Sequence, residues 1–159
     1  MHELPAYVDG LPNLSGSEAL IEAAVAAGRE RPVFLGETPA RLAEVDSAFA
    51  VALHMHQPLI PAGGAELRTA AIVGNLQWML EHPDIGDNHN AAAFRWCYQR
   101  MGELVPQLLG EGFEPRVMLE YSGTLLEGLR RMGAGDVLEA LERLTRDPGV
   151  RHAVEWLGC

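Results

Sequence analysis

The hydrophobic positions of this chain form three short runs, at 48–53, 117–121 and 153–157, separated by long stretches with a helical period. Each run has the length and the β-branched or aromatic content that are typical of a strand. The first run, at 48–53, is unbroken, which predicts a strand that is buried on both faces. The intervening stretches are too long for hairpins, so we expect an α/β fold with parallel neighbouring strands and outer helices.

Four helices are expected between these strands from the spacing of the apolar residues. One is predicted at 66–81, after a loop at 61–64, and another at 94–108, after a polar loop at 82–90. Shorter helices are predicted at 124–132 and 136–146, opened by a capping box that starts at Thr124 and by an Asp136 cap. Trp96 and Cys97 lie beside and on the apolar stripe of the second helix, which predicts that both pack in the core.

The first part of the chain has a different character. Residues 1–45 are predicted to be an N-terminal extension, and residues 46–159 the main domain. Proline and glycine in 4–17 predict an extended arm, and a short helix is expected from Ser17 to Ala27, ended by Gly28. A short edge segment at 31–35 and a turn at 36–39 complete the predicted extension.

Two histidines and an amide follow the first predicted strand, in the sequence His54-Met55-His56-Gln57-Pro58. Side chains alternate along a strand, so His54 and His56 are expected on one side and Met55 on the other. Pro58 lacks an N–H group and ends the strand pairing. The carboxyl end of a strand is where α/β folds place their functional groups, so this segment predicts a site.

These residues resemble glycoside hydrolase family fifty-seven, which contains amylases, 4-α-glucanotransferases and branching enzymes. His54-Met55-His56-Gln57-Pro58 is similar to its first signature, and the segment from Tyr121 to Glu127 is similar to its Ser-Gly-Pro-Leu-Leu-Glu segment, with Thr124 in place of proline. Val154-Glu155-Trp156 lies where its second signature is expected. The resemblance implies the first part of an incomplete, seven-stranded (β/α) barrel.

The resemblance also implies a substrate and a site. An α-glucan is the implied substrate, and the implied substrate-binding residues are His54, His56, Gln57, Glu155 and Trp156. The family uses a retaining mechanism, which needs two carboxylates about 5–5.5 Å apart. Its nucleophile and acid lie on later strands, beyond the position of Cys159, so the catalytic residues stay unknown and we expect these 159 residues alone to be inactive.

Other functions remain open on the same residues. His54 and His56 could bind a metal ion in a metal-dependent hydrolase or deacetylase, because imidazole suits zinc. A non-catalytic carbohydrate-binding protein is a third possibility. Glu120 and Glu155 could form an acid/base pair, or each could be a hydrogen-bonded carboxylate without a role in proton transfer.

Charge and cysteine content narrow the choice of partners. The net charge of -10 argues against binding nucleic acid or an anionic membrane surface. Two widely separated cysteines favour a reducing compartment over a disulfide framework, and no secretory or membrane-spanning segment is evident. We therefore expect a cytoplasmic protein whose partner is a carbohydrate, and the sequence predicts no cofactor and no bound metal.

Overall fold

The structure is a computed structural model that describes residues 6–29, 42–62 and 65–158. The chain divides into two compact units, Met1–Phe49 and Ala50–Cys159. The predicted division lay after residue 45. Each unit is described by itself below, and the predicted segments at 31–35 and 36–39 lie outside the described residues.

The first unit contains a small hairpin where an extended arm was predicted. Strands β1 (Tyr7–Val8) and β2 (Leu11–Pro12) pair in antiparallel fashion. Asp9 and Gly10 connect them with φ angles of 49° and 83°, the backbone that two-residue hairpins require. Helix α1 (Glu18–Arg29) follows and continues through Gly28, and a single 3₁₀ turn lies at Leu42–Glu44.

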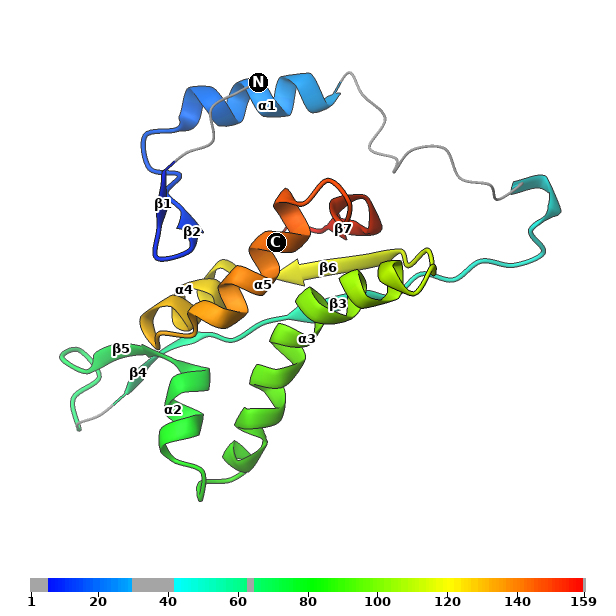
Figure 1. The fold of residues 1–159 in the computed structure, drawn as a ribbon. Helices are drawn as coiled ribbons and strands as arrows, with labels where there is room; N and C mark the ends of the chain where they lie inside the picture. Colours follow the sequence, from blue (N-terminus) through cyan, green and yellow to red (C-terminus); the bar gives the residue numbers. More distant parts are fainter. Residues whose placement is uncertain (1–5, 30–41, 63–64, 159) are drawn as a thin grey trace. The chain divides into compact units, whose positions relative to one another are not determined.

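A three-stranded parallel sheet is the centre of the second unit (Figure 1). Its strands are β3 (Ala52–Met55), β6 (Val117–Tyr121) and β7 (Val154–Trp156), in the order β3-β6-β7. This confirms the three predicted strands and their parallel pairing. The strands described here form an open sheet and not a closed barrel.

The predicted helix at 66–81 is wrong in its first half. Leu59–Ala62 forms β4 and Ala71–Gly74 forms β5, an antiparallel pair beyond the arrowheads of β3 and β6 (Figure 1). Helix α2 begins only at Asn75 and ends at Glu81. Ile72 and Val73 are β-branched residues with high strand propensity, and pairing with β4 gives them a ladder that local periodicity could not reveal.

Three helices and two 3₁₀ turns make up the rest of the described part of this unit. Helix α3 (Ala91–Gly110) is preceded by a 3₁₀ turn at Asn88–Asn90, and helices α4 (Gly123–Arg131) and α5 (Gly135–Arg146) lead to a 3₁₀ turn at Arg151–Ala153. These helices confirm the predictions for their segments, with small changes at their ends. No helix within the described ranges is both long enough and apolar enough to cross a membrane.

Two predicted caps differ from the structure. Ser122, not Thr124, caps α4, because its backbone is extended and its hydroxyl accepts a hydrogen bond from the Leu125 amide at 3.3 Å. Ala134 occupies the N-cap position of α5. Asp136 lies two residues after Ala134, in the first turn of α5, and accepts two hydrogen bonds from Arg95, which ties α5 to α3.

The core lies on one face of the sheet. Leu119 and Tyr121 of β6 are buried, and the Tyr121 hydroxyl donates to the Tyr98 carbonyl of α3 at 2.8 Å. Phe49 is 93% exposed and Val51 is 60% exposed, so the prediction that this run is buried on both faces is wrong. β3 is an outer strand of this sheet, and its residues alternate between exposed and half-buried.

Two close backbone contacts bring the elements of this unit together. A Cβ atom added at Gly102 of α3 would lie 2.6 Å from the Cβ of Ala140 in α5. One added at Gly74 would lie 3.1 Å from the Cα of Gly128 in α4. Glycine at these positions lets the helices and the hairpin approach more closely than any side chain would allow.

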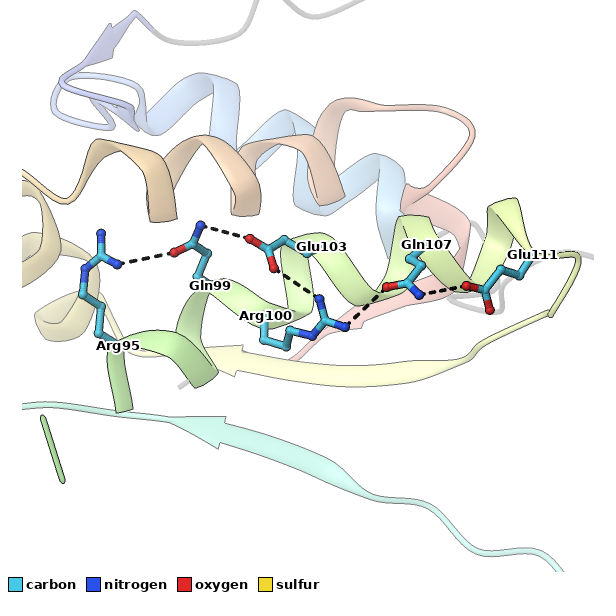
Figure 2. Close-up of polar contacts among 6 residues, drawn as sticks. All are labelled: Arg95, Gln99, Arg100, Glu103, Gln107 and Glu111. Carbon is cyan, nitrogen blue, oxygen red and sulfur yellow. Dashed lines mark hydrogen bonds and ion pairs between the residues drawn. The ribbon is translucent and has the colours of Figure 1, made fainter. Parts of the chain in front are cut away.

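The exposed side of α3 carries a chain of polar contacts (Figure 2). Arg100 links Glu103 to Gln107, and Gln107 donates to Glu111 at 2.8 Å. Cys97 and Trp96 are exposed on the same helix, so the prediction that they pack in the core is wrong. The helix buries the neighbouring positions instead, among them Tyr98, Gly102 and Val105.

A second set of polar contacts attaches helix α4 to the hairpin of β4 and β5. Glu127 accepts hydrogen bonds from Arg130 at 2.9 Å and from Arg131 at 2.7 Å, and Arg131 also donates to the Ile72 carbonyl of β5 at 3.2 Å. The hydrogen bonds from Arg130 and then Arg131 lower the pKa of the Glu127 carboxyl from 4.5 to about 2. The ionised carboxylate is therefore the form that this contact stabilises.

The pKa of Glu127 predicts a loss of stability in acid. Because its folded pKa lies below its unfolded value, its contribution is complete above pH 4.5 and is lost as the pH falls toward 2. Glu127→Gln should lower the urea midpoint at about pH 7, and the difference from the wild-type chain should shrink toward about pH 2.5. An unchanged difference at both pH values would contradict this assignment.

Candidate functional site

The candidate site lies on the face of the sheet opposite the helical core. The Cα register pairs His54 with Glu120 and Met118 with Glu155. Since residues paired across a sheet share a face, these four side chains project from the same side. We call this surface the histidine face, defined by His54, Met118, Glu120 and Glu155.

A histidine–glutamate pair is the central contact of the histidine face. The His54 Nδ1 atom lies 2.5 Å from the Glu120 Oε2 atom. The carboxylate is mostly covered, with 16% of its side chain exposed, whereas 61% of the His54 side chain is exposed. The pair therefore orients the imidazole and leaves its outer part open to solvent.

The chemistry of this pair follows from the two ring nitrogens. When Nδ1 carries the proton and donates to Glu120, the Nε2 atom of a neutral His54 ring is a hydrogen-bond acceptor. A protonated ring offers a donor at Nε2 instead. An exposed, oriented imidazole can thus accept from or donate to a polar ligand.

His56 lies just beyond the end of β3, on the same side as His54. The two rings are stacked, with centroids 5.6 Å apart and planes 11° apart, as the predicted alternation requires. An imidazole binds a metal ion in its own ring plane, and protein zinc sites use at least three protein ligands. Within the described ranges, no group of three or more potential ligands is placed to hold a metal ion.

Gln57 lies on the other side of the strand end, toward the helices. Its Nε2 group donates to the Tyr98 hydroxyl at 2.9 Å, and its Oε1 atom accepts from Asn75 Nδ2 at 2.7 Å. The Tyr98 hydroxyl in turn lies 3.4 Å from the His56 carbonyl, to which it can donate. The amide of Gln57 is therefore held by α2 and α3.

The two tyrosines near this end of the sheet act as neutral donors. Burial is the main reason that the pKa values of Tyr98 and Tyr121 are both raised. A raised phenol pKa favours the protonated hydroxyl. Both hydroxyls therefore keep their protons at neutral pH, as their hydrogen bonds to the carbonyls of His56 and Tyr98 require.

The last two candidate residues lie on opposite faces of β7. Glu155 is exposed on the histidine face. It pairs with Met118 of β6, which is two residues before Glu120 on that strand. Trp156 lies beside Leu119 on the helical face, and its ring is tilted against Tyr121 with centroids 6.1 Å apart. The structure thus brings His54, His56 and Glu120 together, with Glu155 one strand away, and separates Trp156 from them.

Three residues that shape this site have contacts that the sequence did not predict. Glu120 was considered as an acid or base but not as the partner of His54, and neither Asn75 nor Tyr98 was considered as a site residue. Tyr98 offered one usable signal, because a tyrosine on a buried helical stripe needs a partner for its hydroxyl. The other two contacts depend on strand register and on the position of α2.

Comparisons of this chain with protein-family models, with curated proteins and with solved structures found no match. The described residues define a mixed α/β unit with a parallel three-stranded sheet. Its candidate site therefore rests on the geometry of the strand ends and the side chains found there.

Proposed function

We propose that this chain binds an α-glucan on the histidine face, as part of a glycoside hydrolase or transglycosylase resembling family fifty-seven. The observation that carries the proposal is the His54–Glu120 pair at the carboxyl ends of neighbouring parallel strands. Active sites of parallel α/β barrels lie at these strand ends. We propose further that the three-stranded sheet is one part of a (β/α) barrel, which additional strands would complete.

Sugar recognition matches the groups on this surface. A sugar hydroxyl both donates and accepts hydrogen bonds, and an imidazole held through Nδ1 can serve it at Nε2. His54 presents such a ring, and the His56 ring lies beside it, with the two centroids 5.6 Å apart. We therefore assign both rings to substrate binding and assign Glu120 the role of orienting His54.

A mutation pair tests this assignment. His54→Ala should weaken the binding of maltoheptaose to the full chain about tenfold, since it removes about one net hydrogen bond. His152→Ala is the matched control, because His152 is exposed on the 3₁₀ turn that precedes β7 and does not belong to the histidine face. Binding is measured by calorimetric titration, with cellohexaose as a sugar of different linkage.

The outcomes separate the proposal from its alternatives. Binding of maltoheptaose that falls with His54→Ala and not with His152→Ala supports the proposal. No detectable binding by the wild-type chain, or equal loss in both variants, contradicts it. Stoichiometric zinc that disappears with His54→Ala would instead indicate a metal-dependent hydrolase, and binding without turnover by the intact protein would indicate a carbohydrate-binding protein.

A further inference from the structure

We propose that Asn75 and Tyr98 are positioning residues that hold His56 in place, acting through Gln57 and through the backbone. This inference rests on the proposed function only for its sugar-binding readout. It gives Gln57 the role of a link between two helices and the strand end. It also adds two helical side chains, Asn75 and Tyr98, to the residues that the sequence predicts for this site.

The segment after β3 needs such support because it leaves the sheet. The last sheet contact there is the hydrogen bond from the Ser122 amide to the Met55 carbonyl, at 3.0 Å. His56 follows directly, and its carbonyl faces the Tyr98 hydroxyl at 3.4 Å. Two residues later, the Pro58 carbonyl accepts from the Asn75 amide at 2.9 Å. Tyr98 and Asn75 thus hold both ends of the short segment that carries His56.

The side-chain contacts form a chain with one direction. Asn75 Nδ2 donates to Gln57 and also lies 3.3 Å from the sulfur of Met79, a thioether that can only accept. Gln57 then donates to Tyr98, so the Tyr98 hydroxyl has its proton available for the His56 carbonyl. Each donor meets an acceptor, and hydrogen bonds arranged in this way strengthen one another.

The chain of hydrogen bonds from Asn75 to His56 is anchored in the core at both ends. Helix α2 is held by the buried side chains of Leu76 and Met79, next to Asn75. Tyr98 is buried in α3, and its own carbonyl accepts from the Tyr121 hydroxyl of β6. Because both anchors are packed, they can fix the backbone at His56, whose ring lies on the exposed side.

Asn75→Asp tests the donor-to-acceptor direction of this chain of hydrogen bonds, because aspartate and asparagine have nearly the same shape. An aspartate only accepts, so the Gln57 amide should turn over and donate to it, with its oxygen now facing Tyr98. Tyr98 then donates to Gln57, and the His56 carbonyl loses its donor. A carboxylate in the first turn of α2 is also favourable for the helix, so the thermal midpoint should change little.

The expected readouts are specific to His56. In Asn75→Asp, the backbone carbonyl and imidazole NMR signals of His56 should shift, while those of His152 should not. The affinity for maltoheptaose should fall about tenfold, because a displaced His56 ring would lose about one net hydrogen bond to the sugar. A purely structural role of Asn75 would lower the thermal midpoint without this selective shift.

Tyr98→Phe and Tyr121→Phe form a matched pair for the second anchor. Each removes one buried hydroxyl from the same region, but only the Tyr98 hydroxyl reaches His56 and Gln57. Both variants should lower the thermal midpoint to a similar extent. Tyr98→Phe should shift the His56 signals and weaken maltoheptaose binding by more than Tyr121→Phe, which leaves the Tyr98 hydroxyl in place.

The results distinguish this inference from the proposed function. If the wild-type chain binds maltoheptaose but neither Asn75→Asp nor Tyr98→Phe changes the His56 signals and the affinity, the positioning role is wrong. If the wild-type chain does not bind the sugar, the proposed function fails. The His56 signals then decide the positioning role by themselves.

Discussion

Gly102→Ala is expected to lower the free energy of unfolding by about 2 kcal/mol, within the range for overpacked cores. The new methyl group would lie 2.6 Å from the Cβ of Ala140 and 2.7 Å from its carbonyl carbon and oxygen. Two of these atoms belong to the backbone of α5, so the helices must move apart as whole elements. Urea unfolding followed by circular dichroism measures the effect.

Gly110→Ala provides the matched control on the same helix. Nothing lies within 4 Å of a Cβ atom at this position, and alanine is favoured over glycine in a helix by up to about 1 kcal/mol. This variant should therefore be neutral or more stable than the wild-type chain. Equal stability of the Gly102→Ala and Gly110→Ala variants would show that α3 and α5 do not pack as described.

Leu119→Ala is expected to have the largest effect on stability, a loss of about 2–5 kcal/mol. Leu119 is fully buried in β6, the central strand of the sheet. Its removal takes apolar contacts away and leaves a cavity between the sheet and the helices. Chemical unfolding at several urea concentrations measures the change in free energy.

Leu67→Ala is the control for Leu119→Ala. Leu67 is 75% exposed, and surface substitutions of this kind usually change stability by no more than about 0.5 kcal/mol. The two variants remove the same atoms, so a large difference between them measures burial alone. A small effect of Leu119→Ala would mean that β6 is not the centre of the packed structure, and the register that joins His54 to Glu120 would then be in doubt.

The strands and long helices of the second unit could be predicted because their patterns are local. The run at 117–121 coincides with β6, and the predicted helix at 136–146 differs from α5 by one residue. The hairpin of β4 and β5 could not be predicted in this way. Its strands acquire their hydrogen bonds from each other, and residues 66–74 by themselves satisfy a helical spacing equally well.

Burial was the least predictable property. An apolar pattern identifies a helix but not which of its neighbouring apolar positions meets the core. In α3 the helix turns Tyr98, Gly102 and Val105 inward and leaves Trp96 and Cys97 exposed. Gly102 decides this orientation, since its close approach to Ala140 is possible only without a side chain.

For the candidate site, the sequence by itself determined that His54 and His56 share a face, because alternation along an extended chain is a local property. Only the tertiary structure decided which groups meet them. Glu120 reaches His54 through strand register across 66 residues, and Tyr98 and Asn75 reach Gln57 from two separate helices. These contacts depend on how distant elements pack, which no short-range pattern of residues encodes.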